Sequence, residues 1–141
     1  MSHRFDVVHI GDGRRTRPNA AELRERCERC ELGIGFLAFI TRPDDIAAVE
    51  GWVARFGEAD AVAHIEPLTD ALQRVDRAGV VLDAVNRASY GRLGFPQLVR
   101  IQALELALDG VVAEVEIDPT GAVLAGGGLV LAAPHPRRRP L

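Results

Sequence analysis

Lysine is absent from this sequence of 141 residues. The 17 basic residues other than histidine are all arginine. Chemistry that needs an amine side chain is therefore excluded: a Schiff base, covalently held pyridoxal phosphate, and the lysine of a phosphate-binding P-loop. Because arginine carries every such charge, coding bias alone accounts for its abundance. Each arginine cluster has to be judged by its position in the chain.

Serine and cysteine are also scarce. Only Ser2 and Ser89 are present, and neither lies in the G-x-S-x-G turn that presents a nucleophilic serine in α/β-hydrolases. The two cysteines, Cys27 and Cys30, form a single C-x-x-C. These residues identify no particular cofactor.

The apolar run from Ile34 to Ile40 is far shorter than the ~18 to 20 residues that a membrane span requires. The polar residues at 1–4 do not resemble the start of a secretory signal, so we expect a cytoplasmic protein with no membrane partner. The net charge of −3 provides no general attraction to nucleic acid, and no nucleic-acid partner is expected.

A hydrophobic content of 48% and a charged content of 26% are typical of a globular domain. Given the chain length, we expect a single α/β domain over residues 1–133 and a tail rich in proline and arginine over 134–141. A second domain would leave neither half enough residues for a core.

Hydrophobic periodicity and turn residues predict alternating strands and helices. Strands are expected at 5–10, 34–40, 60–66, 111–117 and 122–131, with 34–40 as the sheet centre. Helices are expected to begin after Asn19, Thr41 and Thr69, with a further helix over 97–109 and a loop over 86–96. Capping boxes are predicted for Asn19 with Glu22 and for Thr41 with Asp44. The helix after Thr69 is ambiguous, because residues 79–82 could equally begin a strand.

This order predicts an α/β fold, in which a mixed sheet built from βαβαβ-type crossovers is followed by a C-terminal antiparallel hairpin, with helices packed on the sheet. The turn Asp118-Pro-Thr-Gly121 would close that hairpin. The same elements also permit a two-layer α+β fold with an antiparallel sheet.

Two short motifs could hold a metal. Zinc-dependent nucleobase deaminases combine an H-x-E with a P-C-x-x-C, and this chain contains His64-Ile-Glu66 and Cys27-Glu-Arg-Cys30. Here the order is reversed, no proline precedes Cys27, and both cysteines fall on the apolar stripe of a predicted helix with Leu23. We therefore expect the cysteines to pack in the core and assign no metal site, with a metal site or a redox pair as the alternatives.

The segment from Gly11 to Asn19 is the strongest candidate for a binding site. It joins a predicted strand to a capped helix, a place where backbone amides and the helix N-terminus favour anions, and arginine adds paired hydrogen bonds to phosphate or carboxylate. The residues expected to bind a ligand are Gly11, Gly13, Arg14, Arg15, Arg17, Arg42, Ser89 and Tyr90. An ordinary turn with solvated arginines is the alternative, because the glycine spacing matches neither a P-loop nor G-x-G-x-x-G.

Acid and base residues are expected at the same edge if the first three strands run parallel. His9, Asp12 and Glu66 are the catalytic candidates, with Asp44 as a further carboxylate. A histidine within a β-run is often structural, which is the alternative for His9. The acidic residues Glu114, Glu116 and Asp118 indicate a solvated strand face or, alternatively, a divalent-cation site.

Two functions fit these observations. The first is a small-molecule enzyme or ligand-binding domain acting on an anionic compound, with phosphorylated compounds as one option, at the loop after the first strand. The second is a non-catalytic homo-oligomeric assembly or regulatory protein-interaction module. Self-association is expected in either case, because the glycine-rich last strand would lie at a sheet edge.

Overall fold

The computed structural model of the chain describes residues 5–11, 17–67, 72–85 and 91–133. The elements in chain order are β1 (Phe5–His9), α1 (Ala20–Arg29), β2 (Phe36–Ile40), α2 (Asp45–Phe56), β3 (Ala61–Pro67), β4 (Leu72–Val75), β5 (Val81–Val85), β6 (Gly91–Arg100), α3 (Ile101–Leu108), α4 (Pro119–Ala125) and β7 (Val130–Ala133).

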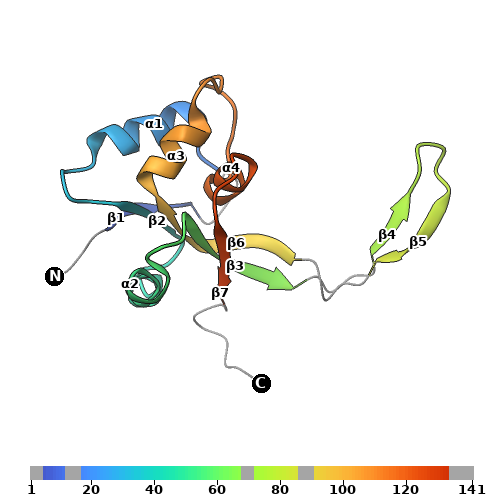
Figure 1. Cartoon of the computed structure of the whole chain (residues 1–141), viewed down its shortest axis with the longest axis horizontal. Helices are drawn as coiled ribbons and strands as arrows, with labels where there is room; N and C mark the ends of the chain where they lie inside the picture. The colour runs from blue at the N-terminus through green and yellow to red at the C-terminus, as the bar shows by residue number, and fades with distance from the viewer. Residues whose placement is uncertain (1–4, 12–16, 68–71, 86–90, 134–141) are drawn as a thin grey trace.

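Five strands form one mixed sheet in the order β1-β2-β6-β3-β7. The β1–β2 and β3–β7 pairs are parallel, whereas β6 runs antiparallel to both β2 and β3. Helices α1, α3 and α4 lie on one face of the sheet and α2 lies on the other (Figure 1). The predicted α/β class, a mixed sheet with helices packed on it, is confirmed. The central strand is β6 rather than the predicted β2.

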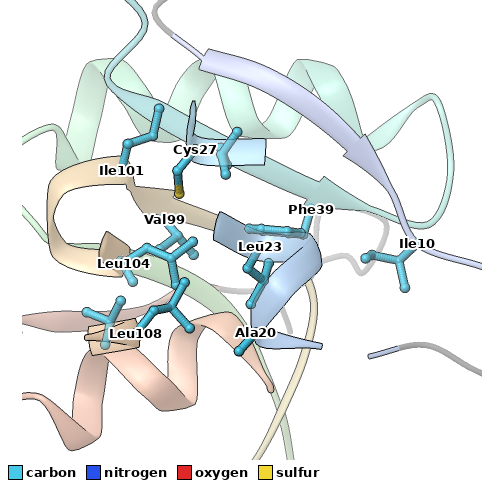
Figure 2. Packing of buried hydrophobic residues seen from close by; sticks show 12 residues of the cluster. Ile10, Ala20, Leu23, Cys27, Phe39, Val99, Ile101, Leu104 and Leu108 are labelled. Carbon is cyan, nitrogen blue, oxygen red and sulfur yellow. The ribbon is translucent and has the colours of Figure 1, made fainter. Parts of the chain in front are cut away.

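The hydrophobic core has one cluster on each face of the sheet. Under α1, α3 and α4, Leu23 and Cys27 pack with Phe39, Val99 and residues of α3 (Figure 2). The five residues of β2 are all buried, as its uninterrupted apolar run predicts. Within the part of the chain that the structure describes, no helix is long and apolar enough to span a membrane.

The two helix starts differ in how well they were predicted. The capping box of α1 is confirmed: Glu22 N donates to Asn19 Oδ1 at 2.9 Å, and Asn19 N donates to Glu22 Oε1 at 3.0 Å. The box expected for Thr41 and Asp44 does not form. Instead the buried Asp45 accepts from the backbone N–H of Thr41 and Arg42 at 3.4 and 3.2 Å, so the carboxylate reaches back to the loop before the helix.

The prediction of a helix after Thr69 is wrong, and the alternative, a strand beginning at 79–82, is confirmed. Residues 72–85 form an antiparallel hairpin, β4–β5, which extends away from the main sheet (Figure 1). Asp76 Oδ1 accepts from Ala78 N and Val80 N, both at 2.9 Å, and Gly79 has a φ of 91°. This side-chain turn closes the hairpin locally and outweighs the helical spacing of the apolar residues.

The prediction of a loop over 86–96 is wrong for 91–96, because Gly91 to Pro96 belong to β6. Residues 86–90 lie outside the described residues. The glycines that argued against a helix here permit close strand packing: a Cβ at Gly91 would lie 2.2 Å from Ile65 Cγ2. The helix expected over 97–109 begins only at Ile101, because β6 continues to Arg100.

The structure places the antiparallel hairpin at 72–85 rather than at 111–131. The segment 111–117 forms an isolated bridge at Glu116 and no strand, because its carbonyls serve α1: Val115 O accepts from Ala20 N, and Ala113 O accepts from Ala21 N. The predicted turn at Asp118 is the start of α4, where Asp118 Oδ1 accepts from Gly121 N at 3.1 Å. The chain then enters β7, which runs parallel to β3.

Candidate functional site

A groove of about 590 Å³ lies between the outer edge of β1 and helix α1. We call it the β1–α1 groove. Its lining residues are Val7, Val8, His9, Ile10, Gly11, Arg17, Pro18, Glu22, Leu23, Glu25, Arg26 and Arg29.

Local sequence explains how the two walls arise. β1 is an edge strand, so one side of its backbone faces the groove. On α1, the wall residues are three or four apart, at 22, 25, 26 and 29, and such a spacing brings side chains onto one helical stripe. The groove therefore has a backbone wall and a helix wall with two acidic side chains followed by two basic ones.

Arg26 is held in place by β1. One of its terminal nitrogens (Nη2) lies 3.2 Å from Asp6 Oδ2 and donates to Val7 O at 2.7 Å. Its side chain is 25% exposed, so the guanidinium is positioned before any ligand arrives. Arg29 is freer: its Nε lies 3.9 Å from Glu25 Oε1, and its side chain is 59% exposed.

The N-terminus of α1 is already saturated. Its first N–H groups, at Ala20 and Ala21, donate to Val115 O and Ala113 O, and those of Glu22 and Leu23 donate to Asn19. The helix start was expected to help bind an anion through its free N–H groups, but none of these is left to donate. Charge on the arginine side chains is what remains for recognition of an anion in the groove.

Of the predicted site residues, His9, Gly11 and Arg17 line the β1–α1 groove, and His9 and Arg17 are exposed. Five others lie outside the described residues: Gly13, Arg14, Arg15, Ser89 and Tyr90. So does the catalytic candidate Asp12.

Glu66 and Arg42 lie at the carboxyl ends of β3 and β2, which is the same end of the sheet as His9, because β1, β2 and β3 run in one direction. They do not line the β1–α1 groove. β2 and β6 separate β3 from β1, so the strands bearing His9 and Glu66 are three spacings, or ~14 Å, apart. That separation exceeds hydrogen-bond reach, and His9 and Glu66 cannot act on one proton directly.

The two metal-type motifs lie in different places. Cys27 packs beside Leu23 in the cluster under α1, whereas a Cβ at Gly94 of β6 would lie 2.8 Å from Glu66 Oε1 and 3.2 Å from His64 Cδ2. Burial raises the pKa of the Cys27 thiol to about 12 and also raises that of Cys30. Among the described residues, no group of three His, Cys, Asp or Glu side chains is arranged to hold a metal ion.

Sequence reasoning did not include Arg26 and Arg29 among the candidate site residues. The available signal was their spacing, since Glu22, Arg26 and Arg29 share a stripe next to the buried one. Only the position of β1 beside that stripe makes it the wall of a groove.

Comparison with known proteins found a likeness in structure only. No protein-family model and no curated protein matches the chain. A 4-diphosphocytidyl-2C-methyl-D-erythritol synthase from Anaerococcus prevotii matches 81% of the chain with a TM-score of 0.63 at 12% identity. A 2-C-methyl-D-erythritol 4-phosphate cytidylyltransferase from Thermus thermophilus matches 84% with a TM-score of 0.58 at 17% identity.

What these proteins share with the chain is the fold. A bifunctional IspDF from Campylobacter jejuni also matches, over 91% of the chain with a TM-score of 0.58 at 18% identity. The chain spans 55%, 59% and 31% of the length of the Anaerococcus, Thermus and Campylobacter proteins, respectively. Identities this low establish the fold alone.

Proposed function

We propose that this chain binds an anionic, phosphorylated small molecule in the β1–α1 groove, as an enzyme or a ligand-binding domain. The observation that supports this most directly is that Arg17, Arg26 and Arg29 line one groove. Of the two acidic residues beside them, Glu22 is engaged in the capping box and Glu25 lies near Arg29. Guanidinium groups in such a groove can pair with two oxygens of one phosphate.

The structural neighbours support the choice of a phosphorylated ligand. The Thermus protein is named for 2-C-methyl-D-erythritol 4-phosphate and for cytidylyl transfer. We extend to this chain only the general class, a phosphorylated small molecule, because the likeness rests on the fold.

We also propose a role for the residues that connect Gly11 to Arg17 in the sequence. Asp12, Gly13, Arg14 and Arg15 connect Gly11 to Arg17, both of which line the groove. We assign the arginines to ligand binding and propose His9 with Asp12 as the acid–base pair of an enzyme. Arg42, Glu66, Ser89 and Tyr90 remain candidates for the part of a ligand that extends beyond the groove.

A second function, a protein-interaction module, is favoured by the β4–β5 hairpin. Val75, Val80, Val81 and Leu82 are each 55–56% exposed on it. An isolated two-stranded hairpin is marginally stable in water, and clustered exposed apolar side chains are typical of protein contacts. Another protein chain packed on these residues would stabilise the hairpin.

Thermal-shift screening of nucleotides, sugar phosphates and carboxylates, followed by calorimetry, tests the proposed ligand class. Arg17→Gln/Arg29→Gln should weaken binding of a phosphorylated hit by about 30-fold if two charge-assisted interactions are lost. Arg55→Gln on α2 is the control for charge and should leave affinity unchanged. Arg14→Gln/Arg15→Gln tests the adjoining segment separately.

The outcomes discriminate between the parts of the proposal. Unchanged affinity in Arg17→Gln/Arg29→Gln, with native folding by circular dichroism, would place the binding site outside the β1–α1 groove. Loss only in Arg14→Gln/Arg15→Gln would restrict the site to the segment after Gly11. No shift with any anion in the screen would contradict the proposed ligand class and leave the interaction module as the better-supported function.

A further inference from the structure

The two edge strands of the main sheet differ in how their outward backbone groups are covered. β1 and β7 lie at opposite ends of the strand order. On β1, Ile10 N donates to Ile40 O of β2, so by alternation the groups of Val7 point away from the sheet. Val7 N donates to Asp6 Oδ1 at 3.0 Å, and Val7 O accepts from Arg26 at 2.7 Å. Side chains therefore occupy the sites at which another strand would bond to Val7.

No equivalent cover exists on β7 among the described residues. Leu129 O accepts from Asp60 N and Ala61 N at 2.9 and 3.1 Å, and Leu129 N donates to Asp60 Oδ2 at 2.8 Å. These bonds direct Leu129 toward β3, so alternation points the N–H and C=O groups of Val130 and Ala132 outward. No hydrogen bond from the described part of the chain reaches them.

The side chains of β7 also lack the usual protection of an edge. Val130-Leu-Ala-Ala133 contains neither charge nor proline, the two common means of preventing strand pairing. Ala132 is exposed, Val130 and Leu131 are half-buried, and the preceding Leu129 is 54% exposed. The edge is therefore accessible, apolar and ready to hydrogen-bond.

We propose that β7 pairs antiparallel with β7 of a second copy of this chain, about a two-fold axis at Leu131. In this register Val130 exchanges both backbone hydrogen bonds with the partner's Ala132, and Ala132 does so with the partner's Val130. The two Leu131 residues then face each other as a pair without hydrogen bonds, where antiparallel side chains approach most closely. The two five-stranded sheets become continuous.

A second copy suits this edge because of symmetry. A two-fold axis brings the same uncharged residues together, so no like charges oppose each other along the strand. Four residues of strand edge cover far less than the ~800 Å² per partner typical of a stable complex. The dimer is therefore expected to dissociate on dilution, and its mass should depend on concentration.

Ala132→Pro tests the register directly. It removes an N–H that points away from β3, so the pairing with β3 retains its bonds while the outward donor is lost in both copies. Sedimentation velocity over a wide concentration range should show the natural chain moving from 15.3 kDa toward twice that mass. The dissociation constant of Ala132→Pro should rise at least about tenfold. Ala132→Ser retains the N–H and should match the natural chain.

A natural chain that stays at one-chain mass throughout would overturn the proposal, as would Ala132→Pro associating as strongly as Ala132→Ser. Association abolished by Val80→Asp/Leu82→Asp but not by Ala132→Pro would assign the contact to the β4–β5 hairpin instead. If circular dichroism shows that Ala132→Pro is unfolded, Ala132→Lys replaces it. That variant places a charge on the exposed face of β7, and dimerisation as strong as in Ala132→Ser would reject the β7 contact.

Discussion

Arg26 of α1 and Asp6 of β1 form an ion pair at the outer edge of the sheet, which we call the clasp, with Arg26 Nη2 lying 3.2 Å from Asp6 Oδ2. Both side chains also bond to the backbone of Val7: Asp6 Oδ1 accepts from Val7 N, and Arg26 donates to Val7 O. The same pair thus covers the β1 edge at Val7 and links β1 to α1, the two walls of the β1–α1 groove.

Replacing Arg26 with Met should lower the free energy of unfolding by ~1 kcal/mol, because Val7 O loses a charge-assisted donor while the pair with Asp6 is partly screened by solvent. Urea unfolding followed by circular dichroism measures the change. Arg29→Met is the matched control, since Arg29 is mostly exposed and only 3.9 Å from its partner Glu25. Equal stability of both variants would show that the clasp contributes nothing.

The Cys27 thiol should make stability depend on alkaline pH. Its pKa is raised from 9.0 to about 12 in the folded chain, first by burial and then by nearby acidic groups such as Glu105. Above pH ~9 the unfolded chain releases this proton while the folded chain retains it, so the free energy of unfolding falls with rising pH, by up to ~1.4 kcal/mol per unit until the folded pKa is passed.

Urea unfolding from pH 8 to 11 measures that slope for the natural chain and for Cys27→Ala. The difference in stability between them should shrink as the pH rises. Stoichiometric zinc in the purified protein, lost on replacing either cysteine, would contradict the assignment of Cys27 to the core.

Gln97 should be among the most sensitive polar positions. Its buried amide accepts from Thr120 Oγ1 at 2.7 Å and Thr120 N at 3.1 Å, and donates to Gly94 O at 3.3 Å, which ties β6 to the start of α4. Gln97→Leu leaves those buried partners unsatisfied and should cost ~2 to 4 kcal/mol.

Adding Thr120→Val should restore part of the stability lost in Gln97→Leu, because the orphaned hydroxyl is removed. A chemical denaturation cycle with both single variants and the double variant measures this coupling. Strictly additive losses would show that the two side chains stabilise the fold independently.

Local signals were sufficient for the first half of the fold. The capping box at Asn19 and the apolar run of β2 each depend on neighbours in sequence, and both formed as predicted. His9, Gly11 and Arg17 could be predicted as candidate site residues because the end of a strand before a helix is a common place for ligands, and all three line the β1–α1 groove. The saturated N-terminus of α1 could not be foreseen, since its acceptors at 113 and 115 are distant in sequence.

The sequence by itself determined the alternation of strands and helices up to β3 and the apolar stripe of α1, because hydrophobic spacing and capping side chains act over a few residues. Tertiary structure decided the course of 91–100 and of 111–131. In β6, Gly91 and Gly94 lie so close to Ile65 and Glu66 of β3 that there is no room for a Cβ. In 111–117, the carbonyls of 113 and 115 accept hydrogen bonds from the first residues of α1 and not from a strand. Tertiary structure also decided that Arg26 and Arg29 line a groove, because a helical stripe is a wall only when another element lies beside it.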